Sequence, residues 1–175
     1  MKKVGITGNI GSGKSWVFQL FMRLGIPVFN SDDEAKRLYD REDVRTAMKL
    51  RFGDDVYLPD DKVNKARVAD IIFNDAKAMH EVERILYPAL HEVFDQWAEE
   101  QDAPYVLYES AIIFEKQLQD RFDAVILVSA TEETRLRRVM LRDHCEEEEV
   151  RERMALQWTE NEKRKLADYI VEHDS

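Results

Sequence analysis

A short segment near the start of the chain, Gly8 to Ser15, has the spacing of a phosphate-binding loop (P-loop): glycine, four residues, then glycine, lysine and serine. Glycines let the backbone turn tightly and direct N–H groups at phosphates, and the positive end of a following helix adds attraction. Lys14 would reach the β and γ phosphates of a nucleotide, and Ser15 would offer its hydroxyl to Mg²⁺. A chance match in a glycine-rich turn is disfavoured, because strand context, spacing and helix context agree.

The motif therefore predicts ATP and Mg²⁺ as ligands, with the N–H groups of Gly11 to Ser15 around the phosphates. Trp16 would add mainly its backbone N–H, toward the α phosphate. The residues that we expect to bind the nucleotide are Gly8, Asn9, Gly11, Ser12, Gly13, Lys14, Ser15 and Trp16.

Two carboxylates are candidates for chemistry beside this loop. Asp32 follows an expected strand, so it would lie at the carboxyl end of a parallel sheet, where ligands bind and where a base could orient an acceptor hydroxyl. An N-cap of the helix that follows is an equally good interpretation of Asp32, a role that Ser31 could also fill. Glu109 closes another expected strand and could hold Mg²⁺ through water, whereas an ordinary strand-end carboxylate is its alternative.

A basic helical face is predicted over Thr131 to Asp143, with a threonine at its cap. Arg135, Arg138 and Arg142 recur at spacings of three and four, so they share one face. Cations on a lid helix would neutralise charge that develops on a transferred phosphoryl group and help exclude water. The alternative is a solvated helix whose arginines pair with nearby glutamates.

Short apolar runs alternate with helical patterns along the chain, which indicates an α/β fold with a parallel sheet in three layers. We expect a five-stranded sheet with strands over residues 4–7, 26–30, 105–109, 124–129 and 167–171.

The long stretch between the second and third expected strands has a helical pattern, and we expect it to form a helical substrate-binding region over residues 32–102. Asn64 and Asp75 are expected helix N-caps, and Pro88 predicts a break or kink. The remaining parts of this single domain would be a core (residues 1–31, 103–131 and 144–175) and a short helical lid (about 132–150).

Charge and cysteine content exclude several classes of function. The formal net charge of −10 argues against a general nucleic-acid binder, and no apolar run is long enough to cross a bilayer. The single cysteine, Cys145, cannot form an internal disulfide, and the start of the chain lacks the apolar segment of a signal peptide. These features predict a cytoplasmic protein.

Beyond the P-loop, an ordered set of motifs resembles the dephospho-coenzyme A kinase family from Lys3 to about His173. The motifs are Gly25-Ile26-Pro27-Val28 leading to Asp32, Lys65 followed by Ile71-Ile72-Phe73, Leu86-Tyr87-Pro88, Ile112-Ile113-Phe114-Glu115, Arg135-Leu136-Arg137-Arg138 with Arg142-Asp143, Gln157, and Ala167-Asp168. The resemblance implies a P-loop kinase core with a helical substrate-binding region and a mobile lid.

It also implies transfer of a phosphoryl group from ATP to the ribose 3′-hydroxyl of dephospho-coenzyme A. By resemblance, Asp32 is the catalytic base, and Lys14, Arg138 and Arg142 stabilise the transferred group. The acceptor would be bound by Asp32, Lys65, Tyr87 and Glu115.

The chain departs from the family pattern at acceptor positions, since Lys65 stands where arginine is usual and Tyr87 where histidine is usual. Lysine does not reproduce the bidentate fork of arginine, and tyrosine does not titrate near neutral pH as histidine does. Another small-molecule P-loop kinase, with a nucleotide or sugar as acceptor, is therefore one alternative. An ATP-binding relative without catalytic activity is the other.

Overall fold

The computed structural model describes residues 1–174, and the chain divides into two compact units. One comprises Met1–Asn30 with Gln101–Ser175, and the other comprises Ser31–Glu100. The first carries the parallel sheet and the P-loop, and the second is helical.

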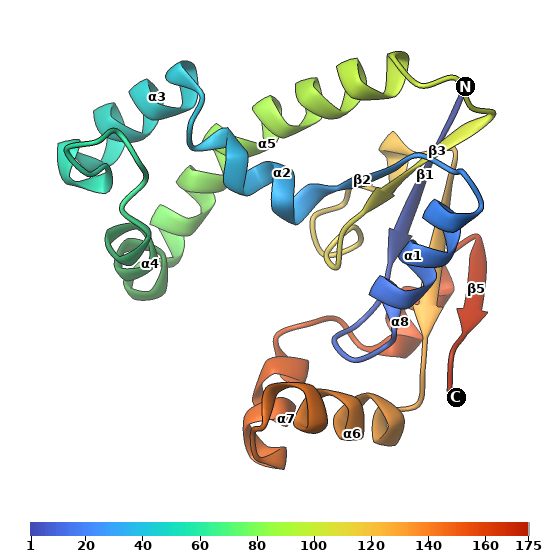
Figure 1. The fold of residues 1–175 in the computed structure, drawn as a ribbon. Helices are drawn as coiled ribbons and strands as arrows, with labels where there is room; N and C mark the ends of the chain where they lie inside the picture. Colours follow the sequence, from blue (N-terminus) through green and yellow to red (C-terminus); the bar gives the residue numbers. More distant parts are fainter. Residues whose placement is uncertain (175) are drawn as a thin grey trace. The chain divides into compact units, whose positions relative to one another are not determined.

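The sheet of the first unit has five strands, all parallel, in the order β2-β3-β1-β4-β5 (Figure 1). The strands are β1 (Lys2–Thr7), β2 (Val28–Asn30), β3 (Tyr105–Glu109), β4 (Ala124–Ser129) and β5 (Tyr169–Glu172). The predicted α/β class and the five-stranded parallel sheet are therefore confirmed.

Two strands begin later than predicted, each because a neighbouring helix uses the first expected residues. Ile26 N donates to Phe21 O at 3.1 Å, which ties it to the end of α1, and Pro27 has no N–H to give to a strand. Ala167 N donates to Lys163 O at 3.1 Å, so it completes α8 and β5 starts only at Tyr169.

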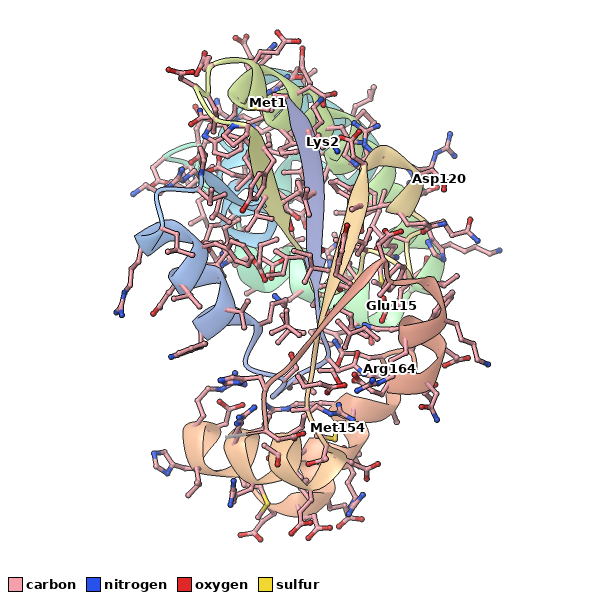
Figure 2. All side chains as sticks on the ribbon, turned by 90° about the vertical axis from the view of Figure 1, so that its right-hand side faces the viewer. Met1, Lys2, Glu115, Asp120, Met154 and Arg164 are labelled. Carbon is pink, nitrogen blue, oxygen red and sulfur yellow. The ribbon has the colours of Figure 1, made fainter. Side chains whose placement is uncertain are left out.

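The helices of the first unit are α1 (Lys14–Arg23), α6 (Glu132–Asp143), α7 (Glu147–Ala155) and α8 (Glu160–Leu166), with a short 3₁₀ turn over Gln119–Arg121. β1 and β2 are connected through α1, and β4 and β5 through α6, α7 and α8. Because the two crossovers run toward opposite edges of the sheet, right-handed connections place α1 and α8 on opposite faces (Figure 2). Helices α6 and α7 lie beyond the carboxyl ends of the central strands (Figure 1).

Apolar side chains from the central strands and α1 form a core cluster under the P-loop. Ile6 of β1, Leu107 of β3 and Val128 of β4 are almost fully buried and pack with Val17 of α1. This packing fixes the strand-to-helix turn from both sides, so the loop between β1 and α1 is held on a rigid base.

The second unit contains α2 (Ser31–Leu38), α3 (Glu42–Phe52), a 3₁₀ turn (Asp54–Val56), α4 (Lys65–Asn74) and α5 (Ala76–Glu99). Both predicted N-caps are confirmed: the side chain of Asn64 accepts from Arg67 N, and that of Asp75 accepts from Lys77 N. Of the expected break or kink at Pro88, the break is wrong, because α5 is one continuous helix of 24 residues that contains this proline. Buried side chains along α5, Phe94 among them, hold the helix together despite the missing N–H.

Tyr57 is the most distinctive buried polar group of the helical unit. The residue is 5% exposed, and its hydroxyl donates to Tyr39 O at 2.9 Å. Burial raises the pKa of Tyr57 to about 12, although the nearby Arg45 opposes this shift.

None of the helices within residues 1–174 is long and apolar enough to span a membrane.

Candidate active site

The P-loop joins the end of β1 to the start of α1, as its glycines predict. Gly11 and Gly13 have φ angles of +79° and +87°, in the left-handed region that glycine adopts without strain. The turn is closed by a hydrogen bond of 3.0 Å from Ser12 N to Asn9 O. Trp16 N donates to Gly13 O at 3.0 Å, so this N–H is engaged inside the first turn of α1.

Lys14 and Glu109 form an ion pair at the carboxyl edge of the sheet. Lys14 Nζ contacts Glu109 Oε1, and the two side chains are only 13% and 7% exposed. Glu109 ends β3 directly opposite Ile6 of β1, so the register of the sheet brings this carboxylate to the lysine of the loop. The structure thus places together two residues that the sequence assigned to phosphate and metal chemistry.

Two buried hydroxyl groups lie in and beside the loop. Thr7 Oγ1 and Ser12 Oγ are inaccessible to solvent and have no hydrogen-bond partner within residues 1–174. Buried polar groups are almost always paired, so such groups mark a place where ligand or water completes the bonding.

The donor set around the loop fits Mg²⁺ held mainly by nucleotide phosphates. Within residues 1–174 there is no cluster of three acidic, histidine or cysteine side chains that could hold a metal by itself. The available groups are the exposed Ser15 in the first turn of α1 and the carboxylate of Glu109. Mg²⁺ commonly takes one or two protein ligands and completes its shell with phosphate oxygens and water.

Helix α6 rests directly on the P-loop. Its predicted cap is confirmed, since the side chain of Thr131 accepts from Thr134 N. Arg138 Nη1 donates to Gly11 O at 3.2 Å, and its Nη2 donates to His173 O at 2.8 Å. Arg135 is 7% exposed, and a Cβ on Gly11 would lie 2.5 Å from its backbone oxygen.

The third arginine of this face has a different environment. Arg142 makes a bidentate contact with the neighbouring Asp143, through Nε at 2.7 Å and Nη2 at 3.0 Å. These hydrogen bonds raise the pKa of Arg142, and they lower that of Asp143. The structure therefore brings Arg138 to the loop and leaves Arg142 at the exposed end of α6.

The chain after β5 also reaches the P-loop. The imidazole of His173 stacks on the indole of Trp16, with ring centroids 5.0 Å apart and an interplanar angle of 21°. A Cβ on Gly13 would lie 2.1 Å from His173 Nδ1, so this ring packs directly against the loop. Asp174 Oδ1 accepts a hydrogen bond of 2.7 Å from Thr131 N, which lowers the pKa of Asp174 and joins the chain end to the cap of α6.

Three predicted acceptor residues belong to the helical unit. Asp32 is exposed and lies in the first turn of α2; since that helix begins at Ser31, Asp32 does not stand at the N-cap position. Lys65 is the exposed first residue of α4. Tyr87 is half-buried on α5, where its ring stacks on His91 with centroids 6.1 Å apart.

Glu115, the fourth predicted acceptor residue, lies in the sheet-bearing unit near α8 (Figure 2). Its Oε1 is 2.7 Å from Nζ of Lys163, a lysine with no exposed surface, and it also accepts from Trp158 N at 3.2 Å. Burial lowers the pKa of Lys163, and the hydrogen bond that its ammonium group donates to Glu115 opposes this shift. Lys163 carried no signal in the sequence, because its neighbours in Glu160–Leu166 are mostly charged and typical of a solvated helix.

A sequence profile of the dephospho-CoA kinase family matches residues 2–175, which is nearly the whole chain. The chain belongs to the dephospho-CoA kinase family. This confirms the resemblance described from its motifs and identifies the protein as an ATP-dependent kinase.

Individual relatives agree with the assignment. The chain is 38% identical over 173 residues to a dephospho-CoA kinase of Porphyromonas gingivalis, covering 98% of this chain and 85% of that protein. It is 36% identical over 179 residues to a dephospho-CoA kinase of Syntrophotalea carbinolica, covering 99% and 84%.

Solved structures show the same fold. A crystal structure of a Thermus thermophilus protein matches with a TM-score of 0.86 at 33% identity, covering 99% of this chain and 89% of that one. A dephospho-CoA kinase from Campylobacter jejuni matches with a TM-score of 0.72 at 22% identity, over 99% of this chain and 88% of that one. At this lower identity the likeness supports the kinase fold and nothing finer.

Proposed function

We propose that the protein transfers the γ-phosphoryl group of ATP to the ribose 3′-hydroxyl of dephospho-CoA, which forms CoA in the last step of its biosynthesis. The observation that carries this proposal is a P-loop whose lysine meets a strand-end carboxylate, in a chain that matches the dephospho-CoA kinase profile throughout. The relatives named above are dephospho-CoA kinases, and their similarity covers at least 98% of this chain. We therefore propose the same acceptor here.

In the proposed reaction the N–H groups of the loop hold the phosphates of ATP, and Lys14 neutralises the β and γ oxygens. For Lys14 to do so, its ammonium group would move from Glu109 toward the nucleotide. The carboxylate of Glu109 would then be free to accept a hydrogen bond from water. Bound Mg²⁺ would be held by Ser15 and, through water, by Glu109, and it would offset negative charge on the transferred group.

Arg138 is proposed as the lid cation nearest to the transferred phosphoryl group. Its guanidinium already bonds to Gly11 O of the loop, so a short side-chain movement is enough to reach a phosphate there. Arg142 would act only after it exchanges Asp143 for a phosphate oxygen. A lid over about residues 132–150 would exclude water, which matters because hydrolysis competes with transfer.

Asp32 is proposed as the base that orients the 3′-hydroxyl and accepts its proton. It follows the end of β2 by two residues in the chain, and its carboxylate is exposed at the first turn of α2. Lys65 and Tyr87 are proposed to contact the acceptor, with Lys65 as a single cation in place of a bidentate fork. We propose that the reaction takes place in the cytoplasm, where a protein with one unpaired cysteine needs no disulfide.

Acceptor profiling tests the proposal. ADP release is measured with ATP, Mg²⁺ and, in turn, dephospho-CoA, a nucleoside monophosphate and a sugar, each checked by mass spectrometry for one added phosphate. The proposal predicts that dephospho-CoA is phosphorylated with the highest kcat/KM. Preference for another acceptor would indicate a different small-molecule kinase, and ATP binding without transfer to any acceptor would indicate a non-catalytic relative.

A further inference from the structure

The connector between α7 and α8, residues 156–159, touches the first half of the P-loop at two points. Gln157 Oε1 accepts a hydrogen bond of 2.8 Å from Ile10 N. Trp158 O accepts a hydrogen bond of 3.1 Å from Asn9 Nδ2, and Asn9 is itself only 4% exposed. Backbone and side chain of the loop are therefore fixed by a segment nearly 150 residues later in the chain.

The connector is in turn held by a buried ion pair. Trp158 N donates to Glu115 Oε1 at 3.2 Å, and the same oxygen lies 2.7 Å from Lys163 Nζ. Lys163 has no exposed surface and also donates to Ala111 O at 3.1 Å. A buried charge without its partner is strongly unfavourable, so the two charges keep each other in place beside Trp158 N.

Gly11, the next residue of the P-loop, is restrained by α6. Arg138 of α6 bonds to Gly11 O, and the backbone of Arg135 leaves no room for a side chain at Gly11. Helices α6 and α7 follow one another in the chain. The pair therefore contacts the P-loop twice, at Gly11 through α6 and at Asn9 and Ile10 through the connector after α7.

We propose that Glu115 is a positioning residue for the nucleotide: by accepting from Trp158 N it fixes the α7–α8 connector, and the connector holds Asn9 and Ile10, so that the N–H groups after them are aimed at the phosphates of ATP. This inference rests on the proposed ATP binding at the loop. It gives Glu115 a role other than the acceptor contact that the family resemblance implies. Anion binding by backbone N–H groups depends on their alignment, and displacements below 1 Å are enough to weaken it.

Two double variants separate the hydrogen bond from the charge. Lys163→Met/Glu115→Gln removes both charges and keeps a carbonyl oxygen that Trp158 N can donate to. Lys163→Met/Glu115→Leu removes both charges and also the acceptor. Lys165→Met, an exposed lysine on the same helix, is the matched control. The dissociation constants of ATP and of dephospho-CoA are measured separately by calorimetry, after thermal melting has shown each variant to be folded.

The proposal predicts that the leucine double variant weakens ATP binding about tenfold, while the glutamine double variant stays within about threefold of the wild type. Affinity for dephospho-CoA should be unchanged in both. Equal ATP affinity in the two double variants would overturn the proposal. So would a loss confined to dephospho-CoA, because that result would make Glu115 an acceptor contact.

If the leucine double variant does not fold, the single variant Gln157→Ala, which changes no buried charge, tests the same proposal. Gln157→Ala removes the acceptor for Ile10 N from a partly exposed side chain, and it should weaken ATP binding several-fold with the affinity for dephospho-CoA unchanged. An unchanged affinity for ATP in Gln157→Ala would overturn the proposal. Wild-type protein that does not bind ATP at all would overturn the proposed function together with this inference.

Discussion

Substituting Gly11 by alanine should separate helix α6 from the P-loop. The added Cβ would lie 2.5 Å from Arg135 O and 2.9 Å from Arg135 Cα, whereas ordinary contacts begin at 3.4 Å. The closer contact is therefore 0.9 Å too short. These are backbone atoms of α6, so no flexible side chain can yield and the helix itself must move. Movement would also weaken the bond from Arg138 to Gly11 O.

The expected cost has three components. Alanine at a φ of +79° costs about 1 kcal/mol in backbone strain, and overpacking against a fixed backbone costs about 1–3 kcal/mol. Weakening the arginine hydrogen bond adds about 0.5–1.5 kcal/mol. Because alanine also reduces the entropy of the unfolded chain, which offsets part of this, we expect a net loss of about 2–4 kcal/mol.

Gly25→Ala is a matched control within the same chain. Gly25 has a φ of +78°, and a Cβ there would have nothing within 4 Å. It should therefore show the backbone term alone, at most about 1 kcal/mol. Urea unfolding gives the free energy of each variant, and calorimetry gives the dissociation constant of ATP. We expect at least tenfold weaker ATP binding in Gly11→Ala and no change in ATP affinity in Gly25→Ala. Equal destabilisation and equal ATP affinity in the two variants would refute the close contact between α6 and the loop.

Three further predictions concern other groups of the structure. Lys14→Met should remove measurable phosphoryl transfer and, because it leaves the carboxylate of Glu109 buried without its partner, lower the unfolding free energy by about 3 kcal/mol; an unchanged urea midpoint would contradict the buried pair. The raised pKa of Tyr57, about 12, means that the unfolded state loses this proton first, so stability should fall as pH rises from about 10 to 12. Tyr57→Phe should flatten that slope in urea unfolding at pH 9 and 11, and equal slopes would argue against the burial. ATP should change the fluorescence of Trp16, which stacks on His173 beside the loop, and a signal that persists in Trp16→Phe would assign the change to another tryptophan.

The strands and the P-loop could be predicted because their signals are local. Residues 105–109 and 124–129 are apolar runs of strand length, and both strands have the predicted bounds. The P-loop is defined by spacing within eight residues, and Gly11 and Gly13 have the positive φ angles that glycine adopts without strain. Asn64 and Asp75 cap helices because a cap needs only a side chain two or three residues away from its donor.

Contacts between distant parts of the chain could not be predicted in the same way. Lys163 is fully buried inside a helix of charged residues, and its partners, Glu115 and Ala111 O, lie about 50 residues earlier in the chain. The position of His173 on Trp16 depends on how β5 ends beside α1, which no local pattern encodes. Pro88 shows the opposite failure: its local signal for a break is strong, yet the buried face of α5 keeps the helix continuous.

The most direct test of the central claim is the product formed from ATP, Mg²⁺ and dephospho-CoA by the wild type, Asp32→Asn and Asp33→Asn. Asp33 is the matched control, because this exposed neighbour pairs with Lys36 at 2.9 Å. We predict that the wild type and Asp33→Asn add one phosphate to the ribose 3′-hydroxyl, and that Asp32→Asn loses about 10²–10⁴-fold in kcat while its ATP affinity is retained. Dephospho-CoA left unphosphorylated by the wild type, or equal kcat values for the two variants, would contradict the account.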